Sequence, residues 1–424
     1  MQQTLFTIPR EIGSVPVFGF GWLFGIWLAA SLWALVSSLR RSGWGPEVRS
    51  YLPAILISGV VIAFVLPRLL DARGLPIRGY GVMLLIAVMS GVVLSVYRAR
   101  QMGIDPEIVL SLAFWMLLPG IVGARLFYIV EYWDEKYRAP TLGESLAAMI
   151  NIAEGGLVVY GGMIAAGVAL IIFVYKNRLP CLAMSDLIAP GVVLGMALGR
   201  IGCFLNGCCY GGACELPWAV RFPMGSPPHF DQLHQGKVDL YGLSFKGLPG
   251  DAPIIAHVKP DSPAAASGLR AGERLRMVDG RAVVNVEFAE RALEQARRAG
   301  EVVEVETADG SIREWTVPDP PPRTLPVHPT QIYSSIDALL LCLFLLAYYP
   351  FRKREGELTA LLLTIHPISR FLIEIIRTDE AAVFNTPFSI SQNISLAVLM
   401  GAIVLWAHLL NQPRGTLLPR PVAA

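Results

Sequence analysis

The sequence predicts an all-α polytopic membrane protein of about nine transmembrane helices, carrying a small α+β domain outside the membrane. Three observations lead to this fold class. Of the 424 residues, 54% are hydrophobic and 16% are charged. The mean hydropathy is +0.52, which is too apolar for an ordinary soluble domain. Long apolar runs recur along the chain, and one charged stretch, 236–320, interrupts them.

Nine apolar runs are long enough, as helices, to cross a hydrocarbon core of roughly 30 Å. They lie at 17–38, 51–70, 80–97, 108–130, 157–175, 187–206, 331–350, 357–377 and 389–410. Segment 1–16 lacks the basic start of a cleavable signal peptide and contains Glu11. We therefore expect the first run to remain as a membrane anchor.

Basic residues between the runs predict the orientation. They gather in the connections that follow odd-numbered runs: Arg40, Arg41, Arg98, Arg100, Lys176, Arg178, Arg352, Lys353, Arg354 and Arg414. The positive-inside rule makes these connections cytoplasmic, with the N-terminus outside and the C-terminus inside. The connection after the second run would then be outside, yet arginines lie in or beside it (Arg68, Arg73 and Arg78). The predicted orientation follows the majority of the connections. The net charge of +2 gives no reason to expect nucleic acid as a partner.

The stretch 236–320 then falls outside the membrane, where a folded insert is expected. Its composition is charged and punctuated by Pro and Gly, and 254–258 and 302–306 are alternating, strand-like runs. Segments 261–273 and 278–281 resemble the PDZ domains of bacterial envelope proteases.

Part of the insert is similar to the carboxylate-binding loop of that family. The loop follows Tyr241 and consists of Gly242, Leu243, Ser244 and Phe245. PDZ domains bind extended peptides by adding a strand to a sheet edge, so the resemblance implies envelope peptides as partners. A PDZ-shaped spacer without a ligand is the alternative.

An arginine lies inside one of the apolar runs. Arg200 belongs to the run 187–206, where an unpaired charge costs at least roughly 2.5–3.5 kcal/mol. Its planar guanidinium suits phosphate, and Gly199, Gly202 and Gly207 let a headgroup or another helix approach closely. A side chain that snorkels from a helix end is the alternative.

A second charged group occupies the run 357–377. Arg370, Glu374 and Arg377 stand at i, i+4 and i+7 and share one helical face. Pairing lowers the membrane cost of the charges and leaves a surplus positive charge for an anion, although an ion pair with a purely structural role would look the same. Arg125 is a third intramembrane cation. Arginines on three separate helices suggest a phosphate-bearing ligand held between helices.

Four cysteines cluster in and after the run that contains Arg200. Cys203, Cys208, Cys209 and Cys214 have C-x4-C-C-x4-C spacing, unlike the C-x2-C halves of zinc sites, so we predict no metal. In an oxidising compartment one or two disulfides would form. Buried, inert thiols are equally compatible with the pattern.

Several of these motifs together resemble the phosphatidylglycerol–prolipoprotein diacylglyceryl transferase family. The matching segments are 77–81, Arg125, 160–162, 185–190, 199–207, 328–333 and 369–377. They occur in the order typical of the family and span 76–410 apart from the insert. We therefore divide the chain into additional N-terminal helices (1–75), a first part of the transferase core (76–235), the PDZ-like domain (236–320) and a second part of the core (321–424).

The resemblance implies an enzyme of the bacterial inner membrane that needs no cofactor. It would move the diacylglyceryl group of phosphatidylglycerol to the lipobox cysteine thiol of a prolipoprotein and release glycerol phosphate. Arg200 and Arg370 would clamp the phosphate, and Glu374 would orient Arg370 or assist proton movement. The remaining residues that would bind substrate are Tyr80, Arg125, Asn206, His328, Gln331 and Tyr333.

The chain departs from the family pattern at three positions. Tyr160 stands where many members have a histidine proposed as the base, and a phenol is a weak base at neutral pH. Cys203 and Cys208 replace a common asparagine and glutamate. The identity of the base is therefore open, and a catalytically impaired homologue that serves as a PDZ-bearing envelope adaptor is one alternative.

Two other function classes fit the sequence less well. A lipid or anion transporter would also place arginines at membrane depth, but the inverted repeats typical of many transporters are not found in the sequence. An intramembrane protease with a PDZ domain would need a catalytic signature such as His-Glu-x-x-His, which the sequence lacks.

Overall fold

The computed structural model describes residues 4–43, 45–70, 74–133, 137, 145, 149, 156, 158–224, 226–234, 242–247, 252–283, 285–286, 288–290, 292–293, 302–316, 323–377, 383 and 386–415. The chain divides into two compact units. Unit I contains Cys203–Ile336 and Pro367–Ala397. Unit II contains Gln2–Gly202, Asp337–His366 and Val398–Ala424.

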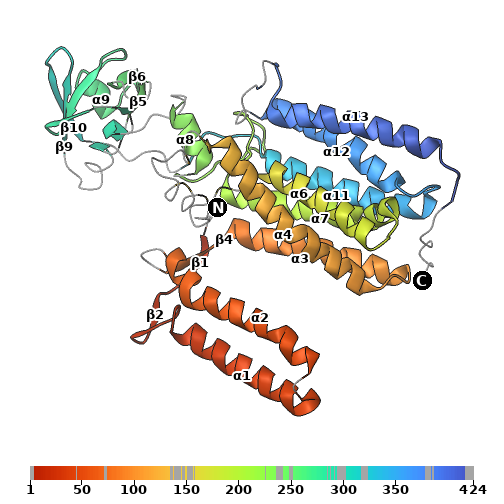
Figure 1. Ribbon diagram of the computed structural model, residues 1–424. Helices are drawn as coiled ribbons and strands as arrows, with labels where there is room; N and C mark the ends of the chain where they lie inside the picture. The colour runs from red at the N-terminus through yellow and green to blue at the C-terminus, as the bar shows by residue number, and fades with distance from the viewer. Residues whose placement is uncertain are drawn as a thin grey trace. The chain divides into compact units, whose positions relative to one another are not determined.

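Long apolar helices make up most of the described chain (Figure 1). They are α1 (Trp22–Ser42), α2 (Pro46–Val60), α3 (Gly79–Gln101), α4 (Pro106–Glu131), α6 (Val159–Lys176), α7 (Cys181–Asn206), α11 (Thr330–Tyr348), α12 (Glu357–Ile376) and α13 (Ile390–Leu410). Seven helices of the described chain are long and apolar enough to cross a membrane, and Ile55–Arg68 and Tyr160–Lys176 are shorter apolar helices. The predicted polytopic helical fold is confirmed, and the predicted runs 51–70 and 157–175 correspond to the two shorter helices.

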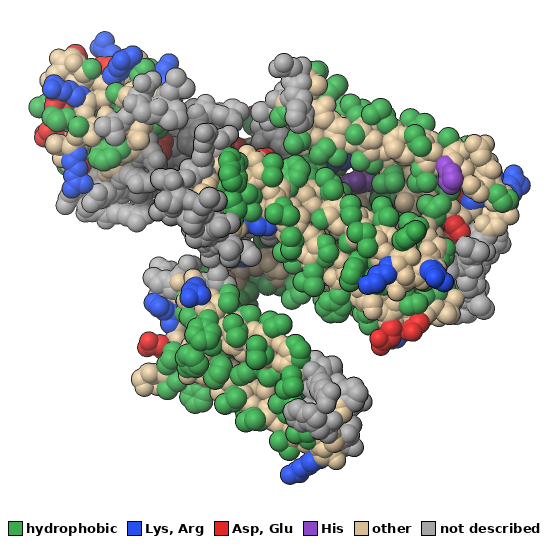
Figure 2. Space-filling model, viewed as in Figure 1, with side chains coloured by type: hydrophobic (Ala, Val, Ile, Leu, Met, Phe, Trp, Pro, Cys, Tyr) green, Lys and Arg blue, Asp and Glu red, His purple; other side chains and the backbone are tan. Residues whose placement is uncertain are grey.

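The outward surfaces of these helices are apolar. Figure 2 shows hydrophobic side chains covering the long helices, whereas charged side chains gather on the insert and near helix ends. Trp33, Val130 and Val404 are 75%, 76% and 70% exposed. Apolar area on this scale is unfavourable in water and is accommodated in lipid. The exposed surface therefore fits helices that are solvated by a bilayer.

Inside unit II, glycines allow two helix pairs to touch through their backbones. A methyl group at Gly191 of α7 would lie 2.5 Å from the carbonyl oxygen of Gly91 in α3. One at Gly161 of α6 would lie 2.4 Å from that of Gly123 in α4. Small residues at such crossings are typical of membrane helices. Helix packing therefore accounts for Gly161 in the glycine-rich stretch 154–163.

A proline in the middle of α7 leaves a backbone carbonyl without its helical donor, and a buried arginine donates to that carbonyl instead. Pro190 has no N–H, so the carbonyl of Asp186, four residues earlier, loses its helical donor. Arg98 of α3 donates from Nη1 to this carbonyl at 3.1 Å and also to the carbonyl of Leu187. The Arg98 guanidinium lies over the Tyr349 ring, 4.2 Å from its centroid. The arginine thus joins α3 to the kinked part of α7.

The carboxylate of Asp186 caps another helix. It accepts the N–H of Gly356 at 2.7 Å and both the N–H and the hydroxyl of Thr359 at 2.8 Å. Gly356 precedes α12 and Thr359 is in its first turn, so a side chain from α7 satisfies N–H groups that the helix itself leaves unpaired. The negative charge also complements the positive end of the α12 dipole.

We expect Asp186→Ala to destabilise the protein, because two backbone N–H groups of α12 would lose their acceptor. Each unsatisfied buried donor costs about 1–3 kcal/mol. Thr359→Val removes only the hydroxyl bond and should cost about 1 kcal/mol. Chemical unfolding of the detergent-solubilised protein measures both changes. Equal stabilities of Asp186→Ala and Thr359→Val would show that the carboxylate does not cap α12.

The core of unit II surrounds α7. Its fully buried side chains include Leu112 of α4, Leu187 and Val193 of α7, Leu345 of α11 and Leu358 of α12. More of α7 is buried than of any other candidate span in the described chain. A helix that is apolar around its whole circumference packs at the centre of a bundle. This placement explains why α7 tolerates glycines and a proline.

The insert in unit I is a small α+β segment. It contains β5 (Leu243–Lys246), β6 (Ile254–Val258), α9 (Pro263–Ala266), β7 (Leu275–Val278), β8 (Arg281–Ala282), β9 (Val302–Thr307) and β10 (Ile312–Thr316). The strand order is β10-β9-β7-β8 in one antiparallel sheet, and β5 pairs with β6 in another. The predicted strands at 254–258 and 302–306 are present as β6 and β9. Buried apolar side chains from both sheets form one core.

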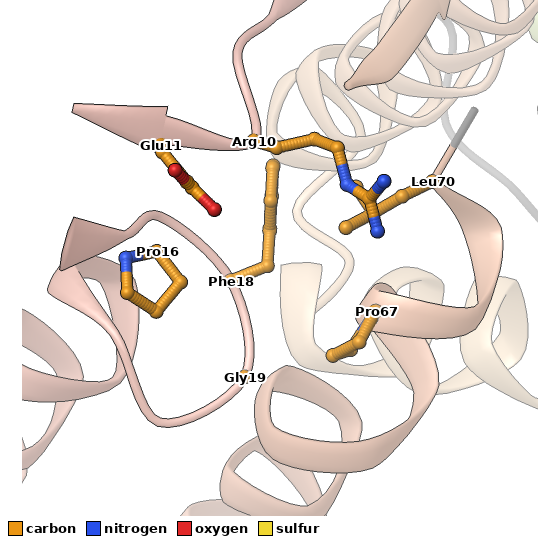
Figure 3. A pocket seen from close by; sticks show the side chains of 7 residues that line it. All are labelled: Arg10, Glu11, Pro16, Phe18, Gly19, Pro67 and Leu70. Carbon is orange, nitrogen blue, oxygen red and sulfur yellow. The ribbon is translucent and has the colours of Figure 1, made fainter. Parts of the chain in front are cut away.

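Short strands and a surface hollow precede α3. The strands are β1 (Thr4–Ile8), which pairs with β4 (Leu75–Arg78), and β2 (Glu11–Ile12), which pairs with β3 (Val15–Pro16). The chain from α2 to β4 includes a π-helical turn, η1 (Val61–Val65), and a 3-10 turn, η2 (Leu66–Leu69). The hollow has a volume of about 590 Å³ and is lined by Arg10, Glu11, Pro16, Phe18, Gly19, Pro67 and Leu70 (Figure 3). Its lining includes none of the predicted site residues.

Candidate functional site

A buried ion-pair cluster lies at the end of α12, in unit I. Arg370 Nη1 lies 2.6 Å from Glu374 Oε2, and Arg377 Nη1 lies 3.1 Å from the same oxygen. The side chains are 12%, 4% and 2% exposed for Arg370, Arg377 and Glu374. One carboxylate therefore holds two guanidinium groups, and the three side chains carry a formal net charge of +1. The shared helical face predicted from their spacing is present.

Two serines at the start of α13 complete this cluster. Ser389 donates its hydroxyl to Glu374 Oε1 at 3.1 Å, and Arg370 Nη2 donates to the hydroxyl of Ser391 at 2.9 Å. Both carboxylate oxygens of Glu374 are thus engaged. Charges this deeply buried are tolerated when paired and hydrogen-bonded, and here the partners come from two helices.

The position of the serines follows from a capping box. The Ser389 hydroxyl accepts the N–H of Gln392 at 3.2 Å, and the Gln392 side-chain oxygen accepts the N–H of Ser389 at 3.0 Å. This reciprocal pair fixes where α13 begins. Neither serine was predicted from the sequence as a site residue. Their signal is the pattern Ser-x-x-Gln at the start of the last apolar run, 389–410.

The loop after α7 is tied to the start of α11 and to the residues just before it. Gln331 Nε2 donates to the carbonyl of Cys208 at 2.7 Å, and the Thr330 hydroxyl donates to that of Cys209 at 2.6 Å. Gly211 N donates to the carbonyl of His328 at 2.9 Å. Gln331 is fully buried, so the structure gives it a role in holding the loop; its headgroup contact stays a prediction.

Three segments converge at Gly211. A methyl group there would lie 2.7 Å from His328 Cβ, 2.8 Å from Thr330 Cγ2 and 3.1 Å from the carbonyl oxygen of Ile376. Gly211 also forms a backbone bridge with Arg377. The loop after α7, the segment before α11 and the end of α12 therefore meet at a position that only glycine fits.

The aromatic side of this region contains two predicted residues. His328 Nδ1 lies 3.3 Å from the hydroxyl of Tyr333, and Trp218 Nε1 donates to that hydroxyl at 2.8 Å. Nearby in the chain, the buried Tyr210 donates its hydroxyl to Asp231 in α8 (Pro227–His234). The sequence analysis did not single out Trp218, Tyr210 or Asp231, because the bonds reach residues distant in sequence.

Other predicted residues belong to unit II. Arg125 is buried and donates to the carbonyl oxygens of Met149 and Gly156, each at 3.1 Å, so at least part of its guanidinium binds backbone. Tyr80 begins α3 and borders Gly202, where a methyl group would lie 3.3 Å from Tyr80 Cδ2. Tyr160 is half-buried at the start of α6. Contact of these residues with substrate stays a prediction.

The remaining two predicted residues lie in α7. Arg200 is half-buried in unit II, and its side chain forms no hydrogen bond or ion pair with any residue that the structure describes. Asn206 is the last residue of α7 and belongs to unit I. The PDZ-like Gly242, Leu243, Ser244 and Phe245 are described, whereas Tyr241 lies outside the described residues.

Comparison with known proteins gives a consistent picture. Residues 67–408 match the family model described as prolipoprotein diacylglyceryl transferase. The phosphatidylglycerol–prolipoprotein diacylglyceryl transferase of Rhodopirellula baltica is 34% identical over 95% of this chain and 88% of its own length. The protein of the same name from Finegoldia magna is 26% identical over 78% of this chain and 91% of its own length. That from Clostridium tetani is 25% identical over 80% and 96%.

Proposed function

The chain belongs to the prolipoprotein diacylglyceryl transferase family, and from that premise we propose that its buried arginines stabilise the phosphate leaving group of the transfer. The substrates of this multi-pass membrane enzyme are phosphatidylglycerol and a prolipoprotein. A bond forms between the lipobox cysteine sulfur and the terminal glycerol carbon of the diacylglyceryl group. The bond from that carbon to the phosphate oxygen breaks, and glycerol phosphate leaves.

The observation that carries the proposal is the cluster of Arg370, Glu374 and Arg377. Negative charge builds up on the phosphate oxygen as the carbon–oxygen bond breaks, and fixed cations away from water stabilise it strongly. The bonds to Glu374 and Ser391 hold the Arg370 guanidinium in place before substrate arrives. The net positive charge of the cluster suits an anionic headgroup. In the same unit Asn206, His328 and Tyr333 shape the headgroup site. The family resemblance adds Arg200 as a second candidate cation and Tyr80 as a candidate headgroup residue.

Glu374 acts as a positioning residue in this proposal. Its two oxygens already contact Arg370, Arg377 and Ser389. A carboxylate so engaged is poorly placed to take the thiol proton. The base therefore lies elsewhere, and Tyr160 is retained as a candidate for a catalytic role.

The orientation of the chain in the inner membrane follows from its basic connections. The N-terminus and the PDZ-like insert are placed outside the cytoplasm and the C-terminus inside. This orientation puts the segments that follow α7 and precede α11 on the outer side of the membrane.

The transferase proposal is tested with the full-length chain in phosphatidylglycerol vesicles and a lipobox peptide. Glycerol phosphate should appear in equal amount to the modified peptide, and a peptide with serine in place of the lipobox cysteine should give neither product. Release of glycerol phosphate without peptide modification would mean a lipase. Movement of lipid or anion across the vesicle without release would favour a transporter.

For the insert we propose peptide binding along β5. Within the described residues β5 pairs with β6 alone, and the proposed peptide would add a strand at its other edge. Ser244 in β5 is 1% exposed, and its hydroxyl has no hydrogen-bond partner among the described residues. Gly242 has φ of +84°, which suits the tight turn that begins a carboxylate-binding loop.

We expect a labelled peptide with a free, apolar C-terminus to bind the full-length chain, because backbone N–H groups of the loop attract the carboxylate. Fluorescence anisotropy measures the affinity. Amidating the peptide C-terminus, or deleting 238–319, should weaken binding at least tenfold. Equal binding by the amidated peptide would mean that the insert does not recognise a C-terminal carboxylate, and it would favour the spacer alternative.

A further inference from the structure

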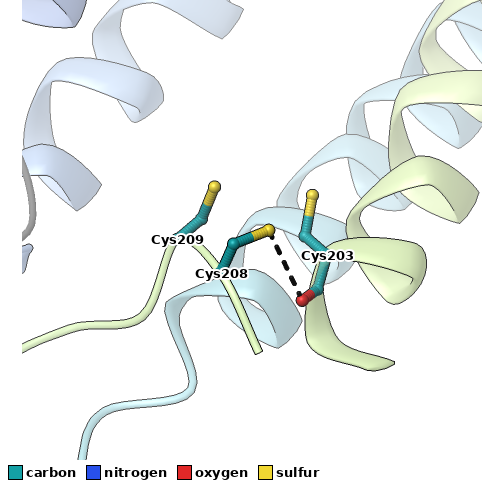
Figure 4. A group of neighbouring side chains, drawn as sticks. All are labelled: Cys203, Cys208 and Cys209. Carbon is teal, nitrogen blue, oxygen red and sulfur yellow. Dashed lines mark hydrogen bonds between the residues drawn. The ribbon is translucent and has the colours of Figure 1, made fainter. Parts of the chain in front are cut away.

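Three thiols meet at the end of α7, and the proposed transfer reaction does not use them. Cys203 is in the last turn of α7, and Cys208 and Cys209 follow the helix end. Their Sγ atoms all lie within 4.8 Å of one another, and each residue is half-buried (Figure 4). No disulfide joins these three cysteines in the structure.

The backbone turns at the helix end to bring these side chains together. The N–H groups of Gly207 and Cys208 both bond the carbonyl of Cys203, at 2.9 and 3.2 Å. Gly207 has φ of +81°, the left-handed conformation typical of a glycine that ends a helix. Cys209 has φ of +60°, which is uncommon for a residue other than glycine. Two successive left-handed corners thus fold Cys208 and Cys209 back toward Cys203.

The first two residues of α11 also hold this loop. Gln331 and Thr330 bond the carbonyl oxygens of Cys208 and Cys209. Gln331 is fully buried, and its Oε1 has no hydrogen-bond partner among the described residues. These contacts hold the loop that carries the thiols, so binding a ligand there would cost little conformational entropy.

The electrostatic setting favours a cation over free thiolates. The C-terminal end of a helix carries partial negative charge, which opposes an isolated thiolate and attracts a cation. A bound cation replaces the thiol protons and neutralises the sulfur charge.

We propose that Cys203, Cys208 and Cys209 bind one Cu(I) ion in a three-coordinate thiolate site. Thiolates select soft metals, and three sulfur ligands suit Cu(I), whereas structural zinc sites require four ligands. Metal–sulfur bonds of about 2.3 Å place trigonal sulfurs about 4 Å apart. The observed 4.8 Å limit therefore needs less than an ångström of closure. Each coordinating thiol gives its proton to solvent, and the copper stays in its +1 state.

This site departs from the sequence expectation of no metal. The C-x4-C-C spacing resembles no common motif, yet the helix end and the left-handed corners bring the three sulfurs together. An ion here would fasten the end of α7 to the loop that Gln331 and Thr330 hold. Its predicted role is structural, and it does not depend on the proposed transferase chemistry.

The test uses the full-length protein in detergent, reduced and kept without oxygen. Cu(I) is supplied as its complex with the chromogenic chelator bathocuproine disulfonate. One Cu(I) per chain should transfer, with affinity falling as pH is lowered, and X-ray absorption should show sulfur ligands only. Cys203→Ser, Cys208→Ser and Cys209→Ser should each weaken binding at least tenfold. Cys181→Ser and Cys214→Ser are matched controls that should bind as the wild type does.

Three results would overturn the site. In the first, the wild type takes no Cu(I) although thiol titration finds all six cysteines reduced. In the second, the purified protein shows two fewer thiols and a mass loss of two hydrogens that a reductant reverses, which would identify a disulfide. In the third, Cys214→Ser abolishes binding as well, which would mean a four-ligand zinc-like site. Arg200→Ala should bind Cu(I) normally. Failure of the copper site can therefore be distinguished from failure of the transferase proposal.

Discussion

Replacing Glu374 by glutamine should lower the rate of glycerol phosphate release by about 10²–10³-fold, the usual loss when a preorganised charge-stabilising group is disturbed. Glutamine keeps the size of the side chain but removes the charge that holds Arg370 and Arg377. The two buried guanidinium groups would then lose the carboxylate that they share. The assay is release of glycerol phosphate from phosphatidylglycerol vesicles with a lipobox peptide.

A graded variant separates this effect from unfolding. Removing one partner of a buried ion pair costs about 3–5 kcal/mol, so Glu374→Gln needs a parallel measurement of thermal unfolding. Ser391→Ala removes only the hydroxyl that Arg370 donates to, and it should lower the rate several-fold with little change in stability. Wild-type rates in both variants would contradict the assignment of this cluster to the phosphate.

Arg200→Ala should also lose most activity, about 10²–10³-fold, while the protein stays folded. In the described chain the Arg200 side chain forms no hydrogen bond or ion pair, so its removal leaves no described polar partner unpaired. A guanidinium inside an apolar helix is costly, and an anionic headgroup offsets that cost. The same vesicle assay gives the rate, and the unfolding temperature reports the fold.

Two further substitutions make the Arg200 result specific. Arg200→Lys keeps the charge but loses the planar fork of donors, so it should retain an intermediate rate. Arg178→Ala removes an exposed arginine from the connection between α6 and α7, and it should leave the rate unchanged. Equal turnover by Arg200→Ala and the wild type would remove Arg200 from the site.

Local sequence features were sufficient to predict the membrane helices and the charged face of α12. The hydropathy of a run of about 20 residues decides whether it can span a bilayer, and this property needs no information from the rest of the chain. Likewise the i, i+4, i+7 spacing of Arg370, Glu374 and Arg377 places them on one face through helix geometry alone. The strands at 254–258 and 302–306 followed from alternation in the same way.

The partners of these residues were decided by tertiary structure. Ser389 and Ser391 reach Glu374 and Arg370 from a different helix. Asp186 caps α12 across more than 160 positions, and Arg98 serves the carbonyl freed by Pro190. Cys203, Cys208 and Cys209 come together only because the chain turns twice through left-handed backbone. Helix periodicity and hydropathy act within one segment, so sequence alone determined which segments cross the membrane and which charges they carry. Contacts between segments depend on how the helices pack, and only the folded chain determined them.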